Sequence, residues 1–168
     1  MAGDQRRQGE LTDRVELREV DGGAGSACAE ILRLLPDWFG IPESNRNYAD
    51  TADTHSGVVA LVDDRVVGIT TVKRHSPYAA EIYLMAVVPD HHRHGIGRGM
   101  LDRVEERLAA DRVEFLQVKT LSASRPDENY AKTRNFWLAC GFRPLEELPT
   151  LWDEDNPALQ LIKVVAPR

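Results

Sequence analysis

Apolar residues recur along the chain with two periods, one typical of β-strands and one typical of α-helices. Runs rich in β-branched and apolar residues predict strands at 15–20, 57–63, 65–73, 81–88, 113–120 and 158–165, with a further strand from Phe142. Apolar residues three or four positions apart predict helices at 27–35, 95–110 and 130–140, with a short helix at 38–48. Strands that surround a strand–helix–strand unit indicate an α/β fold with a mixed sheet.

The strand at 81–88 has almost no polar break, which is typical of a strand buried on both faces. Strict alternation would place Glu81, Tyr83, Met85 and Val87 on the same face of this strand. A short loop follows the strand, and the long amphipathic helix begins directly after that loop.

The loop before this helix contains Gly95-Ile96-Gly97, flanked by Arg93 and Arg98. The first turn of a helix has unpaired backbone N–H groups and the positive end of the helix dipole, and glycines let a ligand approach them closely. This arrangement suits a pyrophosphate, although a bare Gly-x-Gly can equally be a tight turn that packs the helix on the sheet. The chain has no Gly-Lys-Ser/Thr of a P-loop, and Met100 stands where a dinucleotide fingerprint needs its third glycine.

The composition of the chain limits the kinds of binding partner and the cellular compartment that we expect. The net charge is −6, which argues against nucleic acid as a partner, and no apolar run approaches the roughly 20 residues that cross a membrane. Residues 1–12 are polar and lack the core of a secretion signal, so we expect a disordered tail followed by a single domain at 13–168. Cys28 and Cys140 have no metal-type or redox-type spacing, which favours reduced thiols in the cytoplasm.

Two motifs together resemble the GNAT family of N-acetyltransferases. The family's Gln/Arg-x-x-Gly-x-Gly/Ala loop is similar to the segment His92-Arg93-His94-Gly95-Ile96-Gly97, in which His92 replaces the first residue. The family's Phe-Tyr-x-x-x-Gly-Phe is similar to residues 136–142, with Trp137 in place of the Tyr. The resemblance spans residues 58–142 and has both motifs in the family's order.

The resemblance implies a fold and a cofactor. The fold is a central, mostly antiparallel sheet of six or seven strands flanked by about four helices. The cosubstrate is acetyl-CoA, and no metal is required. The residues that the resemblance assigns to acetyl-CoA are Met85, Ala86, Val87, Arg93, His94, Gly95, Ile96, Gly97 and Arg98.

The resemblance also implies direct attack of a bound amine on the thioester, which requires positioning, proton removal and oxyanion stabilisation. Glu81, eleven residues before His92, is the candidate base. It lies four residues, or about 13 Å, from Met85, so we expect a water molecule to relay the proton to it. The alternative is that Glu81 is only a charge at the end of the strand, exposed to solvent. Tyr130 lies two helical turns before Trp137, whose indole cannot act as an acid, and it either takes that role, contacts CoA or only packs.

The acceptor is expected to be a primary amine of a small molecule or a peptide. Trp38 and Phe39 either form an apolar wall of its site or belong to the core. Carboxylates near residues 146–155 would favour a cationic amine. A CoA-binding module without catalysis and an enzyme for another acyl-CoA are the competing hypotheses, and the family resemblance is compatible with a homodimer.

Overall fold

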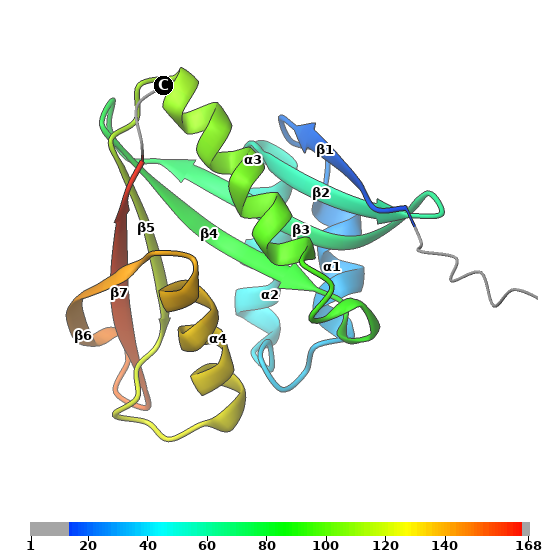
Figure 1. Cartoon of the computed structure of the whole chain (residues 1–168). Coiled ribbons are helices and arrows are strands. Elements are labelled where there is room, and N and C mark those ends of the chain that lie inside the picture. Colours follow the sequence, from blue (N-terminus) through cyan, green and yellow to red (C-terminus); the bar gives the residue numbers. More distant parts are fainter. Residues whose placement is uncertain (1–13, 166–168) are drawn as a thin grey trace, which may run out of the picture.

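The computed structural model describes residues 14–165, so the expected tail at 1–12 lies outside the described residues. Figure 1 shows the arrangement of the helices and strands. Their order is β1 (Glu16–Val20), α1 (Gly25–Arg33), α2 (Pro42–Thr54), β2 (Gly57–Val62), β3 (Arg65–Arg74), β4 (Ala79–Val87), a 3₁₀ turn (Pro89–His91), α3 (Ile96–Ala110), β5 (Phe115–Leu121), α4 (Glu128–Ala139), β6 (Arg143–Asp153) and β7 (Asn156–Val164).

A seven-stranded sheet in the order β1-β2-β3-β4-β5-β7-β6 forms the centre of the fold. Its described strand pairs are antiparallel except for β4 and β5, which run parallel because α3 crosses over between them. The strands predicted at 57–63 and 65–73 are confirmed as β2 and β3, which form a hairpin joined at Asp63 and Asp64 with positive φ angles of 49° and 62°. The predicted fold, a mostly antiparallel mixed sheet with flanking helices, is confirmed.

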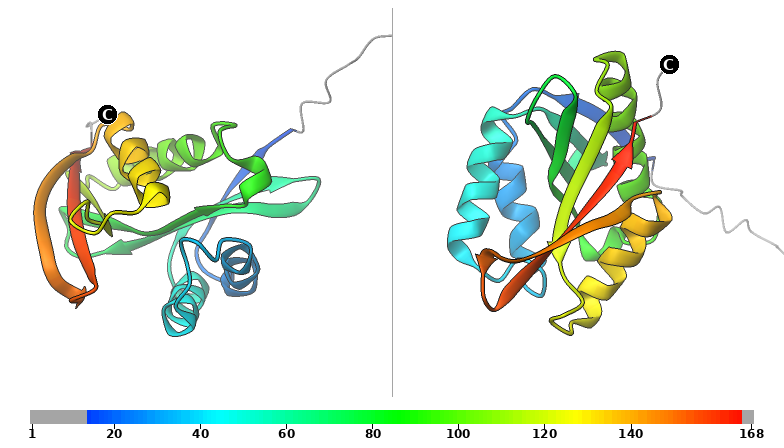
Figure 2. Two further views of the ribbon diagram at one scale, coloured as in Figure 1. Left: turned by 90° about the horizontal axis from the view of Figure 1, so that it is seen from below. Right: turned by 90° about the vertical axis from the view of Figure 1, so that its left-hand side faces the viewer.

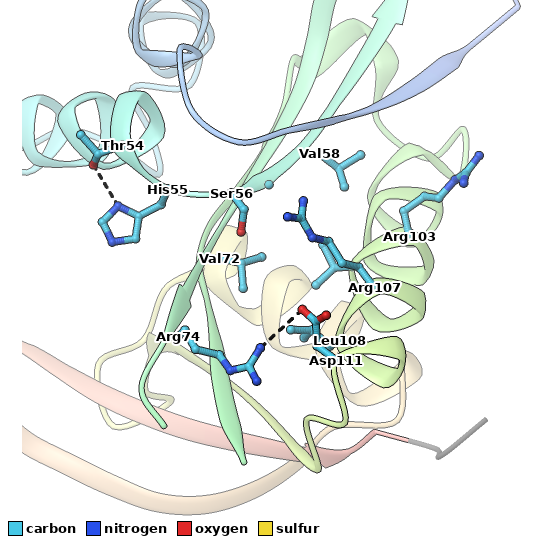
Figure 3. A pocket seen from close by; sticks show the side chains of 12 residues that line it. Thr54, His55, Ser56, Val58, Val72, Arg74, Arg103, Arg107, Leu108 and Asp111 are labelled. Carbon is cyan, nitrogen blue, oxygen red and sulfur yellow. Dashed lines mark hydrogen bonds and ion pairs between the residues drawn. The ribbon is translucent and has the colours of Figure 1, made fainter. Parts of the chain in front are cut away.

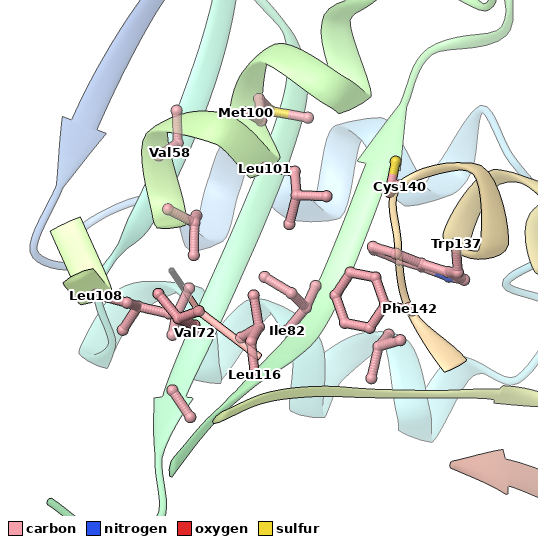
Figure 4. Close-up of a cluster of buried hydrophobic side chains, with 14 of the residues drawn as sticks. Val58, Val72, Ile82, Met100, Leu101, Leu108, Leu116, Trp137, Cys140 and Phe142 are labelled. Atoms are coloured by element: carbon pink, nitrogen blue, oxygen red, sulfur yellow. The ribbon is translucent and has the colours of Figure 1, made fainter. Parts of the chain in front are cut away.

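Helices cover both faces of the sheet, with α1 and α2 on one face and α3 and α4 on the other (Figure 2). The sheet therefore has an apolar core on each side. The α3/α4 core includes Met100, Leu101, Leu116, Trp137 and Phe142 (Figure 4). The core on the other side includes Ile31, Leu32, Ile69, Leu84 and Ala86. Interleaved residues of β4 belong to both cores, which confirms that this strand is buried on both faces.

The second helix differs from the prediction. We expected a helix at 38–48, but α2 begins at Pro42 and extends to Thr54. Proline is favoured in the first turn of a helix because its missing N–H would be unpaired there anyway. Trp38 and Phe39 instead lie in the loop between α1 and α2, where their N–H groups donate to the carbonyl of Leu35.

A β-bulge in β4 contradicts the predicted alternation. The pairing of β3 with β4 shifts between Thr71, which pairs with Leu84, and Val72, which pairs with Ile82. Tyr83 is the extra residue, so the alternation of faces reverses there. As a result Ile82 and Met85 both pack in the α3/α4 core, and Glu81 does not share a face with Met85.

No described helix is both long and apolar enough to cross a membrane.

Candidate active site

The parallel strands β4 and β5 separate halfway along their length. Their described pairing ends at Ile82 and Val118, whereas β4 continues to Val87 and β5 to Leu121. The N–H of Val88 donates to Val67 of β3, and the direction of backbone groups alternates along a strand. The N–H and C=O groups of Met85 and Val87 therefore point away from β3, into the opening beside β5. The Val87 carbonyl is already in contact with His92, and the other three groups face the opening, where a ligand can bind them.

The glycine loop ends next to this opening. After the 3₁₀ turn, Arg93 and Gly95 adopt positive φ angles of 63° and 76°, and Gly95 is the N-cap of α3. No side chain caps this helix, so its first N–H groups are directed toward a ligand or solvent. The loop thus has the backbone geometry of an anion site.

Gly97 brings three segments together. A Cβ atom at this position would lie 3.2 Å from the Phe136 ring of α4 and 3.6 Å from Sδ of Met85. The loop, β4 and the Phe136-Trp137 motif, which are distant in sequence, therefore meet at one point.

The side chains of the loop have separate contacts. The His92 ring lies 2.6 Å from the Val87 carbonyl, through Nε2, and packs edge-on against Trp38 with ring centroids 5.9 Å apart. Arg98 donates to the Ala139 carbonyl at the end of α4 over 2.8 Å. Arg93 and His94 are exposed. His92 and Arg98 therefore hold the loop in place, and Arg93 and His94 are available to a ligand.

Glu81 is buried and lies between two basic side chains. Its Oε1 accepts from Lys119 Nζ at 2.9 Å, and its Oε2 lies 2.6 Å from His75 Nε2. The Glu81 side chain is 8% exposed, compared with 21% for Lys119 and 42% for His75. The alternative of a strand-end charge in solvent is therefore wrong for Glu81.

Tyr130 links α4 to the loop between α1 and α2. Its hydroxyl donates to the carbonyl of Trp38 over 2.6 Å, and its backbone N–H donates to Asp127, the N-cap of α4. Burial and, next, the Asp127 carboxylate raise the pKa of the Tyr130 phenol. The phenol therefore stays protonated at neutral pH.

An aromatic cluster lies on the α1/α2 side of the opening. Tyr48 contacts Phe39 at 5.8 Å and the bulged Tyr83 at 5.3 Å between ring centroids. Burial raises the pKa of Tyr48 to about 12, with smaller contributions from Tyr83, Tyr130 and Glu81. The two candidate catalytic residues thus share a neighbourhood with this cluster. Sequence reasoning missed the pairing of Tyr48 and Tyr83, which the bulge creates.

Trp137 and Cys140 belong to the core. Trp137 packs edge-on against Phe136 and Phe142, with ring centroids 4.9 and 5.2 Å away. Burial raises the pKa of the Cys140 thiol, as expected for a packing residue rather than a nucleophile. No group of three or more metal-binding side chains occurs in residues 14–165.

A hollow of about 240 Å³ lies at the other end of α3 (Figure 3). It is bordered by Arg74, Arg103 and Arg107, but Arg107 pairs with Asp21 at 2.7 Å and Arg74 with Asp111 at 3.6 Å. These pairs use most of the positive charge, and the hollow lies at the C-terminal end of α3, whereas the glycine loop lies at its N-terminal end.

Comparison with known families gave a match to the acetyltransferase (GNAT) domain over residues 53–144. This range includes β4, the glycine loop and the Phe136-Trp137 motif. A comparison with curated protein sequences gave no match.

Solved structures share the fold at low sequence identity. A putative GNAT acetyltransferase from Desulfovibrio desulfuricans superimposes with a TM-score of 0.79 and 19% identity, covering 91% of this chain and 100% of that one. The ribosomal-protein-S18-alanine N-acetyltransferase of Escherichia coli gives a TM-score of 0.73 and 14% identity, covering 92% and 96%. A GNAT acetyltransferase of Elizabethkingia anophelis with acetyl-CoA bound gives 0.69 and 15%, covering 90% and 99%.

Proposed function

From the premise that the chain belongs to the GNAT family of acetyltransferases, we propose that it transfers the acetyl group of acetyl-CoA to a primary amine of a small molecule or a peptide. The observation that carries the proposal is the opening between β4 and β5, which lies between the glycine loop on one side of the sheet and the aromatic cluster on the other. Cofactor and acceptor can then approach the same backbone from opposite faces and react in a ternary complex.

Acetyl-CoA would bind along the α3 side of the opening. The N–H groups at the start of α3, from Ile96 to Arg98, receive the pyrophosphate, and the exposed Arg93 and His94 add donors beside it. The backbone groups of Met85 and Val87 continue the site, with Val87 beside the pantetheine arm. Ala86, which the family resemblance also assigned to acetyl-CoA, directs its backbone groups to Ile69 of β3 instead. Arg98 supports the loop through Ala139.

The reaction is a direct displacement. The amine nitrogen forms a bond to the thioester carbon, the Met85 N–H donates to the oxyanion, and the C–S bond then breaks to release CoA thiolate. Glu81 takes the proton of the attacking nitrogen through water. Lys119 and His75 contact its two carboxylate oxygens and hold the carboxylate in one orientation.

Tyr130 would support the reaction from the acceptor side. Its phenol is protonated at neutral pH, and its proton is directed to the Trp38 carbonyl. Delivery of that proton to the thiolate requires the hydroxyl to rotate. The contact with Trp38 also keeps the loop of Trp38 and Phe39 beside the opening, where the two side chains form part of the acceptor wall.

The test is CoA release from acetyl-CoA with a panel of primary amines, combined with calorimetry of acetyl-CoA binding. We expect acetyl-CoA to bind and at least one amine to support CoA release. Absence of acetyl-CoA binding would refute the proposal. Binding without CoA release by any amine would instead support a module that binds CoA without catalysis. Longer acyl-CoA substrates in the same assay define the acyl preference.

The state of the cysteines supports a cytoplasmic location. Cys28 and Cys140 are both buried free thiols, and free thiols persist in a reducing compartment.

A further inference from the structure

A row of charged side chains crosses β3, β4 and β5 on the acceptor side of the sheet. Lys73 pairs directly with Glu81 in the antiparallel ladder of β3 and β4, so their side chains share a face. Glu81 pairs with Gln117 of β5, and Lys119 lies two residues further on the same face. The row thus consists of Lys73, Glu81 and Lys119, with His75 bound to Glu81 at its edge.

This row has an excess of positive charge. The carboxylate of Glu81 is shared by Lys119 and His75. Lys73 has no carboxylate partner within residues 14–165, and its Nζ lies 3.4 Å from the centroid of the Tyr83 ring. An ammonium over an aromatic face is a weaker contact than an ion pair in the same surroundings, so Lys73 is available to an anion.

Lys73 also lies at a suitable distance from the opening. Tyr83, which carries the ammonium on its ring, precedes Met85 by two residues, or roughly 7 Å along a strand. An acceptor whose amine lies at the Met85 backbone can therefore reach Lys73 with a second group separated from the amine by several bonds.

Resting on the proposed acetyl transfer, we propose that the acceptor is a primary amine that also carries a carboxylate, which binds Lys73 beside Tyr83. The aromatic rings of Tyr48 and Tyr83 pack against the chain that joins its two ends. The carboxylate belongs either to a free amino acid or to an acidic residue of a peptide, and the chemistry of recognition is the same for both.

Three acidic residues of the β6–β7 hairpin lie away from this row. Glu147, Glu154 and Asp155 border a separate groove with Arg125, and Glu147 accepts a hydrogen bond from Ser124. These three carboxylates are therefore near the loop between β5 and α4 rather than near Lys73. Glu146 pairs with Gln160, which pairs with Lys119, so it shares the face of the row but lies two strands beyond Lys119 at the sheet edge.

The test compares matched acceptors in the CoA-release assay. One arm uses ω-amino acids from 3-aminopropionate to 6-aminohexanoate and the alkylamines that lack the carboxylate. The other uses a peptide with aspartate as second residue and its asparagine counterpart. We expect kcat/KM at least about tenfold higher for the carboxylate member in one of the arms, and that arm identifies the source.

Variants separate recognition from folding. Lys73→Gln is expected to raise KM for the carboxylate acceptor about tenfold, with little change in its kcat or in the kinetics of the matched amine. Lys73→Arg should restore most of the preference. Arg65→Gln makes an equal charge change at the exposed far end of β3 and is the matched control. It should leave the kinetics with both acceptors unchanged.

If the wild type turns over amines without a carboxylate, including polyamines, as well as or better than the carboxylate acceptors, this inference is overturned and acetyl transfer stays intact. It is also overturned if Lys73→Gln lowers kcat/KM equally for the carboxylate acceptor and for the matched acceptor that lacks the carboxylate. If no amine in either arm supports CoA release while another primary amine of the panel does, this inference alone fails. If no amine of the panel does, the proposed function fails and this inference fails with it.

Discussion

Glu81 combines burial with two basic contacts, and this combination defines what it can do. A buried polar group is costly to leave without a partner. Lys119 and His75 contact the two carboxylate oxygens at 2.9 and 2.6 Å. The same two contacts fix the carboxylate in one orientation. In the proposed reaction Glu81 is the proton acceptor, and Lys119 and His75 are positioning residues.

The role of Glu81 as base predicts the behaviour of Glu81→Gln. We expect kcat to fall by about 100-fold to 10,000-fold, the usual range for a general base, with the acetyl-CoA dissociation constant unchanged. Glutamine keeps the shape and one acceptor oxygen for Lys119, so the fold is retained. Steady-state kinetics and calorimetry provide the two measurements. Glu146→Gln on the exposed strand β6 is the matched control, and retention of wild-type kcat by Glu81→Gln would exclude this base.

The buried thiol of Cys28 makes stability depend on alkaline pH. Burial and, next, the Asp53 carboxylate raise its pKa from 9.0 to about 11. Because the folded-state pKa is raised, the stabilisation is complete below pH 9 and is lost as pH rises toward 11. At pH 10 the wild type should have lost about 1 kcal/mol of unfolding free energy through this group.

Urea unfolding of the wild type and Cys28→Ala at pH 8 and pH 10 measures this effect. The cavity left by alanine lowers stability equally at both values, so the difference between the two proteins should shrink by about 1 kcal/mol at pH 10. A difference that is the same at both pH values would contradict the predicted ionisation of Cys28.

The element that would form the proposed cofactor site is the turn from β4 into α3. It combines the positive φ angles of Arg93 and Gly95 with a helix start that no side chain caps. Two contacts fix the turn from opposite sides. The His92 ring contacts the Val87 carbonyl, and Arg98 donates to a carbonyl at the end of α4. A loop held in this way pays little ordering entropy when it binds phosphates.

Gly97 is the most sensitive position in this turn. A larger side chain would meet the Phe136 ring at 3.2 Å and displace the loop from Met85. We expect Gly97→Val to weaken acetyl-CoA binding at least about tenfold, or about 1.4 kcal/mol, by calorimetry. Gly99→Ala is the matched control, because its Cβ meets only the flexible end of Leu17 at 3.1 Å. Wild-type affinity in Gly97→Val would show that this contact does not shape the site.

Sequence patterns predicted those elements whose signals are local. The glycine loop could be found because a buried strand, two glycines and an amphipathic helix follow one another directly. The bulge at Tyr83 could not, because it arises from the register with Thr71 and Val72 of another strand. The start of α2 has a local signal, because Pro42 marks its first turn. The apparent helical pattern from residue 38 obscured that signal.

The long strand β6 was predicted only by its start at Phe142. Nearly every residue of β6 is exposed, so its sequence lacks the alternation of apolar and polar residues that would predict a strand. The contacts of Glu81 with Lys119 and His75 were also not predictable, because they join residues 38 and 6 positions apart through the order of the strands.

At the scale of the whole molecule, the sheet separates the proposed cofactor site from the proposed acceptor site, and the two meet at the opening beside β5. The α3 and α4 side carries the glycine loop, and the α1 and α2 side carries Glu81 and the aromatic cluster. The bulge makes this division possible, because it directs Met85 to one side and Tyr83 to the other. Contact between the two substrates then requires only the backbone of β4 between them.

Acetyl-CoA would therefore connect β4, α3 and α4, and its binding should stabilise the whole domain. At a concentration 100 times its dissociation constant, the expected gain is about 2.7 kcal/mol of unfolding free energy, or a rise in Tm of roughly 5–10 °C for a domain of this size. Thermal unfolding with and without acetyl-CoA measures the shift. Gly97→Val should lose the shift and Glu81→Gln should keep it, because the first alters the cofactor side and the second the acceptor side. A loss in both variants would mean that the two sides are coupled through β4 rather than separated by it.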